Sequence, residues 1–167
     1  MNYEIVESPF GTLLLVSDGK ALLRLEFIDL EGGFEPETDW KLQADTVLQA
    51  TRKQLGEWCA GERQAFDLPL APQGTDFQQQ VWQQLRRIPF GETSTYGELA
   101  AVLGKPKAAR AVGAANGKNP ISLIIPCHRV NGSDGSLTGY AWGLERKKQL
   151  LEFERRTEAA RSESTVN

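Results

Sequence analysis

Metal-binding side chains are scarce in this chain, whose 167 residues include one histidine and two cysteines. Zinc sites in proteins rely mainly on cysteine and histidine, so we predict that no metal is bound. The two cysteines, Cys59 and Cys127, show neither a metal-like nor a disulfide-like spacing, which is typical of a reducing compartment. Cys59 follows a helix-like stretch, and we expect it to be structural.

Long hydrophobic runs are also missing. No segment approaches the roughly 20 apolar residues that span a membrane, and the N-terminus lacks the basic-then-apolar order of a signal peptide. We therefore predict a cytoplasmic protein with no membrane partner. A hydrophobic fraction of 40% and four tryptophans are enough for a packed core.

The chain as a whole has no excess of basic charge, since its net charge is −3, but the charge is unevenly spread. Residues 1–74 hold six Lys/Arg and thirteen Asp/Glu, whereas residues 75–129 hold seven and three. From 105 to 129 there is no acidic residue, and the basic ones are Lys105, Lys107, Arg110, Lys118 and Arg129. Such a pattern indicates either a phosphate-contacting surface or a solvated basic helix end, and charge alone does not separate the two.

The first part of the chain, residues 1–73, is predicted to form a small supporting α+β domain. Three short apolar or alternating segments lie at 3–7, 12–16 and 21–27. Turn residues that include Asp18-Gly19 separate them, a pattern typical of an antiparallel meander. The apolar spacing then predicts a helix over 42–58, followed by an extended piece at 65–70.

Residues 74–157 predict a second, mainly helical domain. Apolar residues recur at helical spacing at Phe77, Val81, Leu85 and Ile88. Thr95 and Glu98 fit a capping box at the start of the next helix, which Gly104 is expected to end. A third helix is expected to hold Pro106 in its first turn and to close at Asn116-Gly117.

The second and third of these helices, joined by a tight turn, predict a helix-turn-helix, and a hairpin over 131–136 would supply a wing. The third helix is poor in large side chains, so its backbone can approach either a neighbouring helix or a DNA groove. A last helix is expected to end near Glu154. The polar tail at 158–167 is predicted to be disordered.

A cysteine stands beside the only histidine, in Pro126-Cys127-His128, after the apolar run 121–125, which we expect to be a buried strand. A thiol next to a titratable base is a candidate nucleophile, although a lone Cys-His pair more often marks a buried structural cysteine. Neighbouring side chains of an extended segment point in opposite directions, so we expect water to link the two. Glu154 falls on the apolar stripe of the last helix, where a carboxylate should be paired.

With its flanking motifs, this site resembles the O6-alkylguanine-DNA alkyltransferase family, also called methylated-DNA protein-cysteine methyltransferase. The motifs are Lys105 to Ala115, Asn116 to Pro120, Pro126 to Val130 and Gly139 to Leu144. The likeness is specific from about Phe77 to Glu154 and weaker before it. It implies an α+β fold with a ribonuclease-H-like N-terminal domain of antiparallel sheet and helix. A winged helix-turn-helix domain that binds DNA and carries the catalytic site would follow.

The resemblance implies a DNA-repair protein that moves the alkyl group of O6-alkylguanine irreversibly onto Cys127, with O4-alkylthymine as a second candidate substrate. The damaged base would be flipped out of the duplex, because its alkyl carbon cannot be reached in line within the stack. The thiolate would displace the base in an SN2 step, and the S-alkylcysteine would end the protein's single turnover. No cofactor is implied, because DNA supplies the alkyl group. The expected partner is double-stranded DNA, bound through its minor groove by a monomer.

The same resemblance assigns roles to individual residues. The catalytic residues would be Cys127 as nucleophile, His128 as base, Glu154 to orient His128, Asn119 to fix the turn, and Tyr96 to hydrogen-bond and protonate the base. The base pocket would be lined by Val130, Tyr140, Ala141 and Trp142. The DNA contacts would be Tyr96, Arg110, Lys105, Lys107, Gly113 and Ser133, with Arg110 filling the gap left by the flipped nucleotide. Some relatives carry zinc in the N-terminal domain, for which this chain lacks ligands.

Two other classes of function stay open at this point. A Cys-His-Glu hydrolase would use the same residues but turn over many times. A non-catalytic helix-turn-helix lesion sensor would bind DNA without transferring anything. Sensor relatives of the family carry tryptophan in place of the cysteine, so the thiol of Cys127 favours the transferase.

Overall fold

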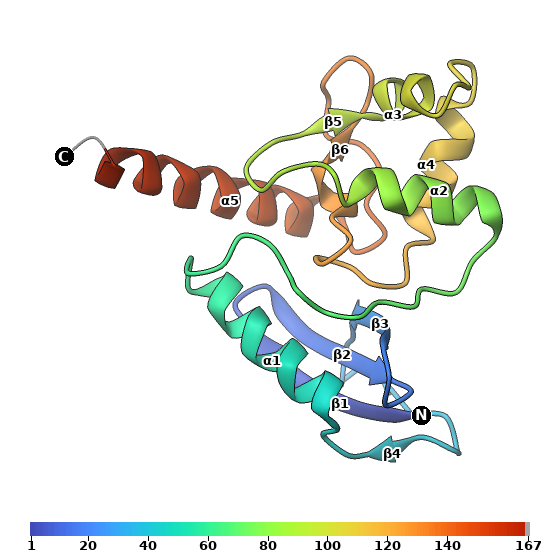
Figure 1. Cartoon of the computed structure of the whole chain (residues 1–167), viewed down its shortest axis with the longest axis vertical. Coiled ribbons are helices and arrows are strands. Elements are labelled where there is room, and N and C mark those ends of the chain that lie inside the picture. The colour runs from blue at the N-terminus through green and yellow to red at the C-terminus, as the bar shows by residue number, and fades with distance from the viewer. Residues whose placement is uncertain (166–167) are drawn as a thin grey trace. The chain divides into compact units, whose positions relative to one another are not determined.

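The computed structural model describes residues 1–165, and the chain forms two compact units (Figure 1). The first unit comprises Met1–Gln73 and a later segment, Pro120–Ile124. The second comprises Gly74–Asn119 and the chain from Ile125 onward. In the described part, no helix has both the length and the apolar character needed to cross a membrane.

The first unit is built on a four-stranded sheet with the order β3-β2-β1-β4. The strands are β1 (Asn2–Ser8), β2 (Gly11–Ser17), β3 (Leu22–Phe27) and β4 (Lys41–Leu42). The predicted meander is confirmed, because β1 pairs antiparallel with β2 and β2 pairs antiparallel with β3. Strand β4, which the sequence did not predict, pairs in parallel with β1.

Helix α1 (Thr46–Cys59) begins four residues later than predicted. Leu42 pairs with Tyr3 in the sheet, and the Asp45 carboxylate caps the helix by accepting a hydrogen bond from Leu48 N at 2.8 Å. An aspartate at this position satisfies a backbone N–H that the helix itself leaves unpaired. The core of the unit combines the central strand and the inner face of α1, namely Leu13, Leu14, Leu15, Val16, Leu48, Leu55 and Trp58.

The second unit contains short helices and a two-stranded parallel sheet. Its elements are α2 (Asp76–Leu85), β5 (Ser94–Thr95), α3 (Tyr96–Val102), α4 (Ala109–Gly117), the 3₁₀ helix η1 (Cys127–Arg129), β6 (Val130–Asn131) and α5 (Leu144–Thr165). Figure 1 shows α3 and α4 together, as the predicted helix-turn-helix requires. The structure therefore has the predicted α+β class, with a small sheet domain followed by a helical one.

Helix caps differ in part from the prediction. The capping box expected at Thr95 forms only half, because Glu98 N donates to Thr95 Oγ1 while the Glu98 carboxylate accepts from the Ser94 hydroxyl instead. A complete box is present at α2, where Thr75 and Gln78 bond each other's backbone N–H groups. Gly104 follows α3 with a φ of +74°, a conformation that suits glycine, as predicted.

Two connections in this unit were predicted wrongly. Helix α4 begins at Ala109 rather than at Pro106, because the chain first makes a turn in which Ala108 N bonds Lys105 O at 2.8 Å. The expected hairpin over 131–136 closes a tight turn, in which Gly132 N bonds Ser136 O at 2.9 Å, but strand β6 pairs with β5 in parallel.

Helix α5 continues to Thr165, so the predicted end near Glu154 is wrong. Glu158, Ala159 and Ala160 are good helix formers, and no proline or glycine interrupts them. The tail expected to be disordered over 158–167 is thus helical as far as Thr165. Its last two residues lie outside the described part.

Candidate active site

The turn that carries Cys127 differs from the strand expected over 121–125. Ile121 makes one isolated bridge with Leu25 of β3, and the residues after it form successive turns. Leu123 has a φ of +69°, which bulky residues rarely adopt. Asn119 Nδ2 donates to the carbonyl of Ile125 at 2.8 Å and so pins the segment just before the cysteine.

Cys127 is only 4% exposed and is the first residue of the 3₁₀ helix η1. The prediction that Cys127 and His128 lie in an extended segment is therefore wrong. The reason is local. Cys127 N bonds Ile125 O at 2.8 Å and Arg129 N bonds Pro126 O at 3.0 Å, which winds the chain tightly. The thiol therefore sits in a nearly dry environment, where charges interact more strongly than in water.

His128 is fully buried and contacts the carboxylate of Glu154 on α5, with Nε2 and Oε2 2.9 Å apart. An ionised carboxylate only accepts, so Nε2 carries the proton and Nδ1 keeps a free lone pair. Nδ1 has no hydrogen-bond partner among the described residues. Burial lowers the pKa of His128 although Glu154 opposes this, so the imidazole rests in its neutral form, ready to accept a proton.

Arg129 completes this buried cluster. Its guanidinium donates to Glu154 at 2.9, 3.1 and 2.7 Å and to the carbonyl of Ile88 at 2.8 Å. Burial would raise the pKa of Glu154, but the hydrogen bonds of His128 and Arg129, the charge of Arg129 and, once the imidazole is protonated, the charge of His128 outweigh it and lower this pKa to about 2. Because Arg129 is 5% exposed, neither of the two interpretations of the basic residues, a phosphate-contacting surface or a solvated helix end, applies to it.

Lys147 is a buried cation of the site that the sequence analysis missed. Its ammonium donates to the carbonyls of Val130 and Thr138. Burial lowers its pKa to about 8, and the nearby Cys127 acts in the opposite direction. A signal was present in the sequence, because Lys147, Leu150 and Glu154 follow the three- and four-residue spacing of one helix face.

Two tyrosines also lie close enough to Cys127 to interact with it electrostatically. Tyr96, the first residue of α3, donates its hydroxyl to the carbonyls of Thr138 and Gly139 at 3.4 and 3.3 Å. The hydroxyl of Tyr140 is buried and has no partner within the described residues. Burial is the main cause that raises the pKa of both tyrosines, so both are protonated at neutral pH.

The remaining residues predicted to line a base pocket occupy one stretch of chain. Val130 is fully buried, and its carbonyl accepts from Lys147. Trp142 is partly exposed and Ala141 is exposed. The structure thus gathers Tyr96, Tyr140 and Lys147 near the thiol and leaves Ala141 at the surface.

The residues predicted to contact DNA lie on and around α4. Arg110 and the small residues Ala111 and Ala114 are exposed, whereas Val112, Ala115 and Asn116 form the buried face. Lys105 and Lys107 are exposed in the turn before the helix, with Lys105 Nζ 5.1 Å from the Phe77 ring centroid. Gly113 faces the Tyr96 ring, and the exposed Ser133 approaches Gly97. Small side chains therefore serve both close helix packing and a smooth exposed surface.

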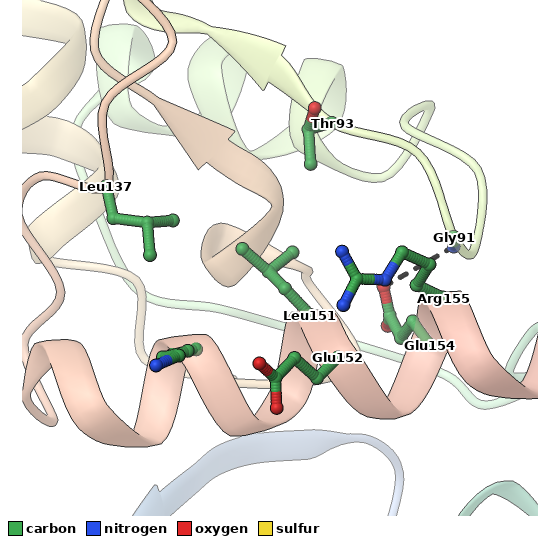
Figure 2. Close-up of a pocket in the computed structure, with 8 residues that line it drawn as sticks. Gly91, Thr93, Leu137, Leu151, Glu152, Glu154 and Arg155 are labelled. Carbon is green, nitrogen blue, oxygen red and sulfur yellow. Dashed lines mark hydrogen bonds between the residues drawn. The ribbon is translucent and has the colours of Figure 1, made fainter.

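A cavity of about 370 Å³ opens beside α5 and reaches the carboxylate of Glu154 but not Cys127 (Figure 2). Gly91 N donates to Glu154 Oε1 there at 3.4 Å. The cavity is lined by Gly91, Thr93, Leu137, Lys148, Leu151, Glu152, Glu154 and Arg155.

Among residues 1–165, no group of three or more His, Cys, Asp or Glu side chains is placed to hold a metal ion.

Comparison with known proteins gives consistent matches along the chain. Residues 76–156 match the DNA binding domain of 6-O-methylguanine DNA methyltransferase, and residues 1–72 match its ribonuclease-like domain. The chain is 50% identical over 154 residues to a methylated-DNA–protein-cysteine methyltransferase of Methanosarcina barkeri, covering 92% of this chain and 97% of that protein. The Mycobacterium tuberculosis enzyme of the same name is 48% identical over 156 residues, covering 93% of each chain.

Solved structures agree with these matches. The crystal structure of the Mycobacterium tuberculosis O6-methylguanine methyltransferase matches with a TM-score of 0.84 and 47% identity, covering 93% of each chain. A crystal structure of Mycobacterium tuberculosis OGT in complex with DNA matches with a TM-score of 0.85 and 44% identity, covering 94% of each chain.

Proposed function

Since this chain belongs to the 6-O-methylguanine DNA methyltransferase family, and so repairs DNA by moving alkyl groups onto one of its own cysteines, we propose Cys127 as the acceptor. The observation that carries this proposal is the buried contact of His128 with Glu154 directly beside Cys127. Cys59, in the other unit, has no histidine near it in the sequence and a pKa raised by burial, so it is a poor nucleophile.

The proton of the Cys127 thiol passes to Nδ1 of His128 through a water molecule. Only the thiolate is strongly nucleophilic, so a base is needed for rapid attack. The Nε2–H bond to Glu154 leaves Nδ1 as the basic nitrogen, and the carboxylate stabilises the imidazolium that forms. Arg129 is a positioning residue in this scheme, because its three contacts fix both oxygens of Glu154.

The thiolate then attacks the alkyl carbon of the lesion. A carbon–sulfur bond forms, the carbon–oxygen bond to the base breaks, and the electron pair leaves with guanine, which receives a proton from the Tyr96 hydroxyl. Val130, Tyr140, Ala141 and Trp142 line the space for the base. The product is a thioether, which has no carbonyl that water can attack, so one molecule repairs one lesion and no cofactor takes part.

The damaged nucleotide must leave the duplex, because Cys127 is buried and cannot reach a stacked base. The exposed small side chains of α4 allow its backbone to enter the minor groove, where the exposed Arg110 fills the gap. Lys105, Lys107, Gly113 and Ser133 complete the contacts with double-stranded DNA. One copy of the chain holds all these groups, which supports a monomer as the active form; the cytoplasmic location stays a prediction.

The stoichiometry of repair tests this function against a Cys-His-Glu hydrolase and a lesion sensor. A duplex with O6-methylguanine is added in tenfold excess, and restored guanine is measured over time. We expect the yield to stop at one equivalent of protein. Continued turnover would identify a hydrolase-like enzyme, and binding without any restored guanine would identify a sensor.

A further inference from the structure

Asn116 is a buried polar residue of α4 that the proposed mechanism does not use. It is 3% exposed and lies on the helix face that points away from solvent, with Val112 and Ala115. Its Nδ2 donates to the backbone carbonyl of Cys127 at 3.4 Å. Asn116 therefore joins the helix expected to bind DNA to the turn that carries the nucleophile.

Tyr96 lies against the same face of α4. A Cβ atom on Gly113 would meet its ring at 3.8 Å, and Gly113 precedes Asn116 by three residues, so both residues face Tyr96. Burial and Cys127 raise the pKa of Tyr96, and Asn116 acts in the opposite direction.

The hydroxyl of Tyr96 therefore has two kinds of neighbour. The carbonyls of Thr138 and Gly139 accept its proton, which favours the neutral phenol. The amide of Asn116 acts to lower the pKa of Tyr96, which favours the oxygen after its proton has left. A group that gives up a proton needs hydrogen-bond acceptors around its hydroxyl before the transfer, and a neighbour that stabilises the negative oxygen during the transfer.

We propose that Asn116 is a positioning residue that stabilises the Tyr96 oxygen while its proton moves to the departing guanine. The inference rests on the proposed function and deepens it. As the carbon–oxygen bond of the lesion breaks, the O–H bond of Tyr96 breaks and an N–H or O–H bond forms on guanine. The amide N–H of Asn116 offsets the negative charge left on Tyr96, and water returns the proton after the base has gone.

The other end of the Asn116 amide supports a functional role. Its Oδ1 is buried and, within residues 1–165, has no hydrogen-bond partner. A buried acceptor without a donor destabilises a fold. Replacing Asn116 with leucine, which has a similar size, removes this unpaired acceptor but also removes the donor to the Cys127 carbonyl, so the two effects on the unfolding free energy oppose each other and the variant should stay folded.

A double-mutant cycle tests the proposal. Single-turnover rates of methyl transfer to Cys127 are measured at saturating O6-methylguanine duplex for the wild type, Asn116→Leu, Tyr96→Phe and the double variant. One hydrogen bond to a developing charge corresponds to about tenfold in rate. We expect Asn116→Leu to slow transfer by about that factor in the wild type, and by less than about twofold when Tyr96 is phenylalanine.

The controls separate the possible failures. Asn116→Ser serves in place of Asn116→Leu if the latter unfolds, and Thr51→Val, a buried hydroxyl change in the other unit, should keep the wild-type rate. An undiminished loss in the Tyr96→Phe background, or no loss at all, would overturn the role of Asn116. If the wild type itself fails to methylate Cys127, the proposed function is wrong instead.

Discussion

At the residue scale, Glu154 holds the two other members of the buried cluster together. It is fully buried, and its carboxylate contacts both His128 and Arg129. Burial would raise its pKa, but the interactions with those two residues outweigh that effect, and the pKa falls from 4.5 to about 2. The ionised carboxylate is therefore part of the stability of the fold as well as of the proposed chemistry.

This shift predicts how stability depends on pH. A depressed carboxylate pKa adds stability that is fully present above pH 4.5 and is lost as pH falls towards 2. The contribution is about 3 kcal/mol at 1.36 kcal/mol per pKa unit. Urea unfolding of the wild type and of Glu154→Gln between pH 7 and about 2 should show the difference in free energy shrinking over this window. A constant difference would contradict the account.

Lys147 should affect how the unfolding free energy depends on pH at alkaline pH. Its pKa in the folded chain is about 8 rather than 10.5, so between these values the unfolded chain binds more protons. Stability from this residue should therefore rise with pH across that range. Compared with Lys147→Met, the wild type should gain unfolding free energy from pH 8 to 10.5; parallel curves for the two proteins would show that Lys147 is not desolvated.

At the element scale, regular elements were predictable and irregular ones were not. The meander follows from alternating side chains, and α2 from a helical period. The run 121–125 is equally apolar, but its conformation depends on Asn119, on a bridge to Leu25 and on the left-handed Leu123, which no periodicity encodes. The local sequence pattern identified regular helices and hairpin strands. It missed segments whose conformation is fixed by hydrogen bonds to particular residues elsewhere in the chain.

The site shows the same division. The cysteine, histidine and glutamate could be predicted because the motifs that carry them resemble a family. Arg129 and Lys147 were not assigned, because a basic residue is usually exposed and is buried only where it has partners. Arg129 is held by the carbonyl of Ile88 and the carboxylate of Glu154, and Lys147 is held by the carbonyls of Val130 and Thr138.

Helix α4 predicts an effect of side-chain size alone. Ala114 is exposed on it, so leucine there should leave the fold intact but hold the backbone away from DNA. We expect Ala114→Leu to weaken duplex binding at least tenfold, by the ~1.4 kcal/mol that corresponds to that factor, with little change in melting temperature. Ala159→Leu, on the exposed side of α5, is the matched control. Equal affinities of the two variants would remove α4 from the DNA interface.

At the scale of the whole molecule, the net charge of −3 conceals a basic region in the second unit. Binding to DNA should nevertheless weaken steeply with salt, because released counterions drive it. Lys107→Ala should reduce the slope of log affinity against log salt by about one phosphate contact, whereas Lys53→Ala in the first unit should not. Fluorescence anisotropy at several salt concentrations measures both slopes, and an unchanged slope for Lys107→Ala would place the interface elsewhere.

The division of the chain also has a feature that only the structure reveals. Residues Pro120–Ile124 belong to the first unit although the sequence around them belongs to the second. They make two backbone hydrogen bonds with Leu25 of β3: Leu25 N donates to Pro120 O, and Ser122 N donates to Leu25 O, each at 2.9 Å. The nucleophile-bearing turn therefore begins only two residues after a segment anchored on the first unit's sheet.

The central claim is that Cys127 becomes an S-alkylcysteine, and peptide mapping by mass spectrometry tests it most directly. The protein is mixed with an equimolar duplex that contains O6-methylguanine, digested, and compared with the Cys127→Ala variant. The account predicts one added methyl group on the peptide that holds Cys127, restored guanine in the DNA, and neither change in the variant. Restored guanine with an unmodified Cys127, or a methyl group on Cys59, would contradict it.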